Sequence, residues 1–202
     1  MLQIQSDTEY REKNFDKCEL ADQQISGIKF IDCSFKDADL QDVRTSGCIF
    51  TNCDFTQARL NMSEHKHSAF LNCRFAAAHL SSVTFDQCKL TGSSFEAASL
   101  FAIKIIEGDW SYVNLSDCDL KAVDLRKVRL VEADLYGADL EKADLRQADL
   151  ARAVLAKANL FGADFRGANM EGIDFLNTNL RGAKIDLAQA VLFAEAHGIQ
   201  VD

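Results

Sequence analysis

The chain has 202 residues, enough for one domain or two small ones, and 48% of them are apolar while 26% are charged. This balance is typical of a folded protein with a real core and excludes a disordered chain. Acidic residues outnumber basic ones by 31 to 22, and the formal net charge of −9 argues against binding of DNA, RNA or anionic membranes through bulk charge.

The N-terminal part of the chain carries no targeting or membrane signal. Its first 30 residues hold charges throughout, and no run approaches the roughly 18 apolar residues of a membrane helix. The 7 cysteines form no CxxC pair and no zinc-like spacing, which favours reduced thiols. We therefore expect a cytoplasmic protein without a membrane contact.

A five-residue repeat runs from Tyr10 to Ile185 without losing its register. Leu occupies 17 and Phe 11 of the 36 positions whose numbers are multiples of five, and small residues occupy most positions two residues earlier. A period of five fits neither the 3.6 residues of a helix nor the 2 residues of a continuous strand. If each unit forms one side and then turns, one large and one small side chain per side point inward. The chain then winds as a square coil that is stable only when coils stack.

The repeating unit identifies a family. Ala-Asp-Leu at 133–135, 138–140, 143–145 and 148–150, with Ala-Asp-Phe at 163–165, resembles the consensus of the pentapeptide-repeat family. The resemblance covers about nine-tenths of the chain. It implies an all-β solenoid, a right-handed quadrilateral β-helix with four units per coil and therefore about nine coils over residues 1–185.

Four units per coil place residues twenty apart in one column. Leu then recurs in every coil from Leu20 to Leu180, and Phe recurs from Phe15 to Phe95 in another column. This second period supports four sides rather than three. The same columns predict a core of stacked Phe and Leu side chains.

Cysteines and histidines have structural explanations in this pattern. All cysteines fall on the small inward column, where Ala is the alternative occupant, so we expect buried free thiols. His65 and His67 are too few ligands for a structural zinc site. No catalytic motif, phosphate-binding loop or cofactor signature stands out, so the sequence predicts neither an enzyme, nor a metal, nor a cofactor.

Two segments interrupt the pattern, near 61–69 and at 101–112. The first has a polar centre at His65, and the second has bulky or apolar residues at unusual positions. Both are expected to be irregular: one interpretation is a coil distorted by bulky residues. The other is a bulge or short helix that exposes a partner-binding group, because excursions on rigid scaffolds often carry recognition. The residues of that possible group are Phe101, Ile106, Trp110 and Tyr112.

After Ile185 the repeat stops and a helix is predicted. Asp186 is a suitable N-cap and Gly198 suits the position after the C-cap. The helix is apolar around most of its girth, so one face can cap the solenoid while another favours self-association. Residues 182–201, GAKIDLAQAVLFAEAHGIQV, also resemble the C-terminal segment of the quinolone-resistance (Qnr) proteins, where it forms a dimer contact. The expected dimer interface consists of Leu187, Val191, Leu192, Phe193, Ala194 and Ile199.

Acidic residues recur just before each large centre in the C-terminal half. The carboxyl groups of these Asp residues, like the amide groups of the Asn residues at the same position in other repeats, can hydrogen-bond the backbone of the turns. The Asp charges can also form stripes along the rod. A dimer would carry a formal net charge of −18. Stripes of carboxylates can bind in a basic groove in the way that the phosphates of DNA do. The candidate partner-binding carboxylates are Asp119, Asp124, Asp134, Asp139, Asp144, Asp149 and Asp164.

The resemblance to Qnr proteins implies a function. It suggests a homodimeric DNA mimic that binds DNA gyrase or another type II topoisomerase and protects it from poisons such as quinolones, albicidin or related toxins. Inhibition of supercoiling would be a further consequence of such binding. The alternative is a non-catalytic interaction scaffold with another protein partner, because the repeat specifies a fold better than a function. Neither interpretation involves direct binding of nucleic acid.

Overall fold

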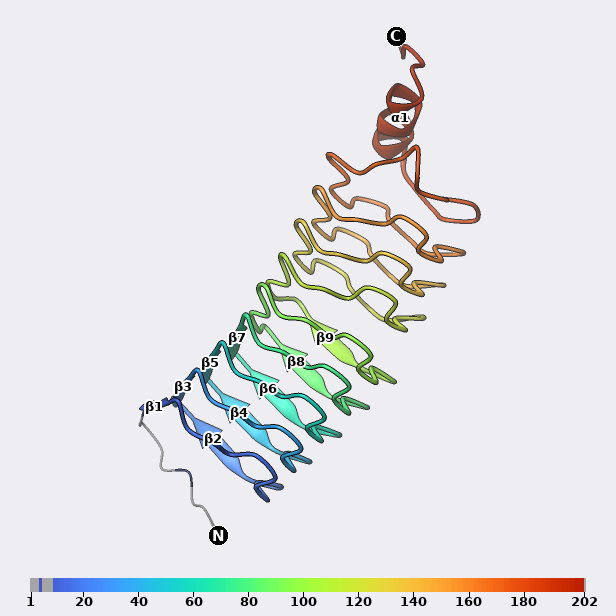
Figure 1. Cartoon of the computed structure of the whole chain (residues 1–202). Helices are drawn as coiled ribbons and strands as arrows, with labels where there is room; N and C mark the ends of the chain where they lie inside the picture. The colour runs from blue at the N-terminus through green and yellow to red at the C-terminus, as the bar shows by residue number, and fades with distance from the viewer. Residues whose placement is uncertain (1–3, 5–8, 202) are drawn as a thin grey trace.

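The computed structural model describes residue 4 and residues 9–201, which form a parallel β-solenoid with one short helix (Figure 1). Coils stack into a rod, with the described N-terminal strand at one end and α1 (Leu187–Ala196) at the other. The predicted repeat region starts at residue 1, but residues 1–3 and 5–8 lie outside the described part of the chain. So does residue 202 of the predicted C-terminal segment.

The named strands form two parallel sheets on successive sides of the coil. One has the order β1-β3-β5-β7 and the other the order β2-β4-β6-β8-β9, so these strands make about five turns. The strands are β1 (Glu9–Arg11), β2 (Gln24–Ser26), β3 (Lys29–Ile31), β4 (Arg44–Ser46), β5 (Ile49–Thr51), β6 (Glu64–Lys66), β7 (Ala69–Leu71), β8 (Thr84–Asp86) and β9 (Lys104–Ile106).

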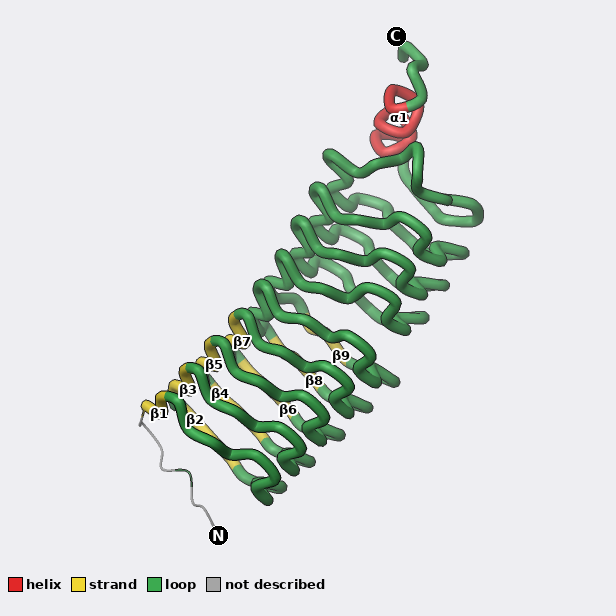
Figure 2. Tube along the Cα trace, in the orientation of Figure 1, coloured by secondary structure: helices red, strands yellow, loops and turns green. Residues whose placement is uncertain are grey.

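Pairing between coils has a spacing of twenty residues. Phe30 pairs with Phe50 and Phe50 with Phe70, and every named strand pairs at the same spacing. Single bridges continue this spacing as far as Asp164 and Lys184, although Figure 2 shows the chain between β9 and α1 as loop. The predicted stacking by twenty is therefore confirmed, and the count of nine coils stays a prediction.

Each side of the coil ends in a turn that needs one left-handed residue. That residue stands two positions after the large centre, as at Asp22 (φ 61°), Asn52 (φ 52°) and Lys127 (φ 60°). Left-handed backbone is costly for most L-residues and easy for Gly, which explains the Gly residues at this position in several repeats. The period of five is thus set by a short extended side and one such corner.

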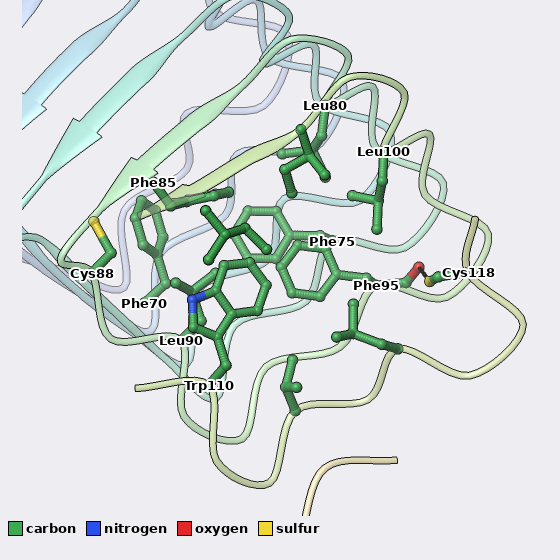
Figure 3. Packing of buried hydrophobic residues seen from close by; sticks show 14 of the residues in the cluster. Phe70, Phe75, Leu80, Phe85, Cys88, Leu90, Phe95, Leu100, Trp110 and Cys118 are labelled. Carbon is green, nitrogen blue, oxygen red and sulfur yellow. Dashed lines mark hydrogen bonds between the residues drawn. The ribbon is translucent and has the colours of Figure 1, made fainter. Parts of the chain in front are cut away.

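The core consists of the large and small inward columns, as predicted. Phe35 and Phe55 stack with ring centroids 4.9 Å apart, and similar stacks run through the N-terminal half. Figure 3 shows where this Phe stack meets Trp110, whose ring lies against Phe95 with centroids 5.6 Å apart. Beyond it, Leu fills the same interior.

The cysteine thiols are all free, and all but the half-buried Cys18 are buried. In the buried ones the Sγ donates to a carbonyl of the preceding coil, as from Cys73 to Phe50 (3.5 Å). Burial raises the pKa of the Cys118 thiol to about 12 and that of Cys88 to about 11. The structure therefore agrees with the buried free thiols that the sequence predicts.

Of the two segments expected to be irregular, the one near 61–69 keeps the regular repeat, so the expectation is wrong there. The one at 101–112 keeps the turns of the repeat but loses part of its pairing with the next coil within the described chain, as the interpretation of a distorted coil predicts. Near 61–69, β6 pairs in register with both β4 and β8. His65 fits there because Thr45 and Ser63 supply hydrogen-bond partners inside the core. At 101–112 the structure has β9, paired in register with β8, rather than a bulge or short helix.

The helix closes the C-terminal end of the solenoid as the sequence predicts. Asp186 accepts from the backbone N–H of Gln189, and the Gln189 side chain accepts in turn from the backbone N–H of Asp186. Gln189 is the buried residue of the helix, and its Nε2 donates to the carbonyls of Phe165 and Ala168. It therefore satisfies backbone groups that the last coil leaves open.

Candidate functional site

The acidic residues before each centre hold the turns of their own repeats. Oδ1 of Asp119 accepts from the backbone N–H of Lys121 at 3.1 Å, and Oδ1 of Asp134 accepts from Tyr136 at 3.0 Å. The same bond recurs at each of the candidate carboxylates. The predicted turn role is confirmed, and it leaves Oδ2 of each carboxylate for other contacts.

Three of the candidate carboxylates share one column and are paired with arginines. The acids are Asp124, Asp144 and Asp164, and each contacts the Arg two residues later, with Nη2 2.6 Å from Oδ2. The hydrogen bond from Arg166 lowers the pKa of Asp164 to about 2, and the equivalent bonds lower the pKa values of the other two. This column is therefore a ladder of alternating charges rather than a bare anionic stripe.

A fourth carboxylate is also compensated. Asp149 lies 3.7 Å from Nε of Arg129, whose Nη1 lies 3.3 Å from Asp109. Arg129 thus stands between two acids of neighbouring coils.

The remaining three candidates have no ion pair among the residues that the structure describes. They are Asp119, Asp134 and Asp139, on adjoining sides of two consecutive coils. The backbones of Asp119 and Asp139 form a β-bridge between those coils. Lys121 lies close by in sequence, but its Nζ is 2.5 Å from Oε2 of Glu141. We call Asp119, Asp134 and Asp139 the unpaired acidic set.

Three of the four residues of the possible partner-binding bulge are exposed and the fourth is buried. Phe101, Ile106 and Tyr112 are exposed, at 76%, 48% and 55% of their surface. Trp110 is fully buried against Phe85 and Phe95, so its predicted exposure is wrong. The reason is that position 110 is one of the large inward centres.

The predicted dimer residues lie on α1 and, for Ile199, just after its end. Leu187, Leu192 and Ile199 are exposed, whereas Val191, Phe193 and Ala194 are half-buried. Phe193 packs edge-on against Phe175 with centroids 5.9 Å apart. Phe193 therefore caps the solenoid, and the apolar side chains of Leu187 and Leu192 are exposed on the helix.

A buried polar cluster was missed at the sequence level. Nδ1 of His65 lies 2.8 Å from Oγ1 of Thr45, and Nε2 lies 3.0 Å from Oγ of Ser63. Burial lowers the pKa of His65 to about 3. The signal was present, since polar centres one coil apart at 45 and 65 predict contact. The cluster is sealed in the core and has no carboxylate partner in the described chain, which suits structure rather than chemistry.

Residue 4 and residues 9–201 contain no group of three His, Cys, Asp or Glu side chains arranged to hold a metal ion. Within that same part of the protein, no helix has the length and apolar character needed to span a bilayer.

Comparison with known proteins places these features in a family. The profile "Pentapeptide repeat region" matches residues 78–155, and "Pentapeptide repeats (8 copies)" matches residues 24–63 and 158–191. No curated protein sequence matches the chain.

Among solved structures, the chain is similar to QnrB1, described as a plasmid-mediated fluoroquinolone resistance protein. A trypsin-treated variant of QnrB1 matches at 25% identity and a TM-score of 0.86, over 96% of this chain and 97% of that one. The full-length form matches at 24% identity and a TM-score of 0.86, over 95% and 98% of the two chains. With its repeat register, its two inward columns and these matches, the chain belongs to the pentapeptide-repeat family and is Qnr-like in structure.

Proposed function

We propose that this chain is a non-enzymatic protein of the cytoplasm that binds a type II topoisomerase, DNA gyrase, and protects it from poisons such as quinolones, albicidin or related toxins. The observation that carries the proposal is the match to QnrB1 along almost the whole of both chains. Gyrase as the partner follows from the resemblance to Qnr proteins.

The surface proposed to dock is the unpaired acidic set. Asp119, Asp134 and Asp139 keep one oxygen on a turn and form no ion pair with an arginine or lysine of the described chain. Carboxylates held on a rigid rod can occupy a basic groove that otherwise receives DNA phosphates. The ladder of Asp124, Asp144 and Asp164 supports this role less well, because its arginines cancel its field.

The active form is proposed to be a dimer of right-handed rods, each with nine four-sided coils. The bridges that persist to Lys184 at twenty-residue spacing support the coil count. Leu187 and Leu192 support the dimer, because large apolar side chains exposed on a terminal helix favour association. The division into a repeat region at 1–185 and a C-terminal dimerisation segment at 186–202 belongs to the same proposal.

A general interaction scaffold is the second candidate. The observation that favours it is the charge compensation at Asp124, Asp144, Asp149 and Asp164, which reduces the similarity of those sides to DNA. Under this alternative another protein would bind the rod, and gyrase would not.

The deciding experiment is supercoiling by purified gyrase, with and without the protein, across a panel of poisons. We expect the protein to restore supercoiling in the presence of at least one poison and to form a complex with gyrase in its absence. Failure to form any complex, together with unchanged sensitivity to every poison, would leave the scaffold as the function.

A further inference from the structure

One strand in the middle of the solenoid has a free edge. β9 is the last strand of the sheet β2-β4-β6-β8-β9, and only its edge toward β8 is paired. The twenty-residue bridges that continue other columns are absent between residues 99 and 119 and between residues 104 and 124 of the described chain. Figure 1 shows the coil that bears β9 standing apart from the next coil along this side.

Backbone hydrogen bonds between the coil that bears β9 and the next coil are absent over a continuous stretch of the described chain. Bonds to the next coil are present from Phe95 to Asn114 (3.0 Å) and from Trp110 to Arg129 (2.7 Å). Between them, within the described residues, the backbone N–H groups of Leu100, Ile105 and Glu107 make no such bond, although the equivalent groups one coil earlier do. Such unpaired backbone groups form a template for pairing with another strand.

A groove lies directly beside this free edge. Its volume is about 450 Å³, and its lining includes Ile105, Ile106 and Glu107 from the strand side and Asp124 and Arg126 from the next coil. A groove of this size is within the range of small-ligand and peptide sites. The free edge is therefore open to a chain that approaches from outside.

Cationic groups border the groove in one column. Arg126, Arg146 and Arg166 all line it, and each uses Nε and Nη2 to hold its own Asp. The third nitrogen, Nη1, of these guanidiniums has no hydrogen-bond partner among the described residues. Three stacked donors are thus free to receive carboxylate or carbonyl oxygens.

The largest buried side chain lies next to the break. Trp110 packs against Phe85 and Phe95 (Figure 3). The equivalent centres hold Phe at 30, 50 and 70 and Leu at 90, 130 and 150. The indole Nε1 of Trp110 is buried without a hydrogen-bond partner in the described structure. The indole is larger than the Leu side chains of the adjoining coils, and we infer that it acts as a wedge that holds the two coils apart on the far sides.

We propose that the free edge of β9 binds an extended peptide by strand addition. The backbone of the peptide pairs with the N–H groups of Ile105 and Glu107 and with the carbonyl of Ile103. Its alternate side chains are apolar toward Ile105 and acidic toward the Nη1 groups of Arg126 and Arg146. Main-chain pairing supplies affinity in this mode, and the side-chain contacts supply selectivity.

The first test is hydrogen exchange on the full chain, with and without a probe peptide of six alternating valine and glutamate residues. In the free protein the amides of Leu100, Ile105 and Glu107 should exchange faster than those of Leu80, Phe85 and Gln87, one coil earlier. The probe should protect Ile105 and Glu107. Equal protection of both coils in the free protein would show a closed ladder and overturn the proposal.

Three controls separate strand addition from simple charge attraction. A probe N-methylated at alternate amides keeps its charge and should bind about tenfold more weakly, since its hydrogen-bonding edge is blocked. Arg126→Ala should weaken the unmodified probe, and Arg59→Ala, in a distant coil, should not. Equal binding of the methylated and unmodified probes contradicts the proposal.

The wedge is tested by Trp110→Leu. Leu is already present in this column, so the variant should fold, regain protection at Leu100 and Ile105 and lose the probe. A variant that folds, keeps the amides unprotected and still binds would remove Trp110 as the cause but retain the site. Loss of binding without renewed protection would count against the free edge as the site.

Discussion

Arg146 donates two parallel hydrogen bonds to Asp144, from Nε to Oδ1 at 2.8 Å and from Nη2 to Oδ2 at 2.6 Å. The pair spans a single turn, because the residue before a centre and the residue after it face the same way out of the coil. The motif Asp-Leu-Arg recurs at 124–126 and 144–146, and Asp-Phe-Arg follows at 164–166, in steps of twenty residues. Much of the candidate acidic surface is thus neutralised by its own repeat.

This pairing divides the candidate acids into two sets that mutation can compare. Asn at positions 119, 134 and 139 removes three unpaired charges and keeps the Oδ1 that holds each turn. We expect the triple variant to stay folded and to associate with gyrase roughly tenfold more slowly, because the steering field is lost. Stopped-flow or surface-based kinetics at two salt concentrations would measure the rate and its screening.

The matched control is Asn at positions 124, 144 and 164. It removes the same number of negative charges and leaves the guanidinium groups of three arginines unpaired, so the net charge changes equally while the unpaired acidic set is kept. If that set is the docking surface, the association rate should fall clearly less than in the first variant. If the two triple variants are impaired equally, net charge alone governs binding. If neither is impaired, electrostatic mimicry is not the cause of binding.

The sequence was sufficient for the architecture because each repeat carries the same local information. Every large centre and every small inward residue is visible in the pattern, and so are the N-cap Asp186 and the turn role of residues such as Asp134. Features that depend on contacts between repeats were less visible. The pairing of Asp164 with Arg166 needed the direction of the side chains, and the free edge of β9 needed the hydrogen bonds between coils, which no single repeat reveals.

Gly108 should be essential for the fold although its position is normally filled by Ala or Cys. A Cβ at this residue would clash with the carbonyl oxygen of Cys88, and its φ is 107°. Gly108→Ala should therefore destabilise the protein by about 3 kcal/mol, since the backbone of the neighbouring coil cannot move aside. Urea unfolding would measure the loss. In Gly47→Ala nothing lies within 4 Å of the added atom, so about 1 kcal/mol is expected.

The core should tolerate a loss of volume better than a charge. Leu140 is fully buried in the Leu column, and Leu140→Asp places a carboxylate there without a partner. We expect this variant to be insoluble or unfolded. Cys73→Ala should cost about 1–2 kcal/mol, because Ala already fills this column in other coils. Circular dichroism and urea unfolding distinguish the two outcomes, and a collapse of the Cys73→Ala fold would revive a redox or metal role for the thiols.

The exposed face of the terminal helix should form the dimer contact but should not be needed for the solenoid to fold. Leu187 and Leu192 are exposed at 81% and 38%, so the double change to Lys should give folded monomers at micromolar concentration. Phe193→Lys should instead loosen the cap, since Phe193 packs on Phe175. Sedimentation gives the assembly state and thermal unfolding gives the stability. An intact protein that sediments as a monomer would refute the dimer.

His65 makes the stability of the solenoid depend on pH. Burial lowers its pKa to about 3, whereas an unfolded His titrates near 6.5, so between these values the unfolded chain binds a proton that the folded chain refuses. Stability therefore falls as the pH drops through this window, by about 1.4 kcal/mol per pH unit for one proton. At neutral pH both states are neutral at this residue, and no loss arises from it.

The change that tests this is His65→Phe. Phe suits the site because Phe85 stacks on the imidazole from the next coil, and Ser63 and Thr45 keep partners in Leu60 and Ser68. Urea unfolding between pH 4 and 7 should show a slope that is shallower by about one proton than that of the unmodified protein. His79→Gln, at an exposed position, is the control and should retain the original slope. An unchanged slope in His65→Phe would mean that the imidazole is protonated inside the folded core.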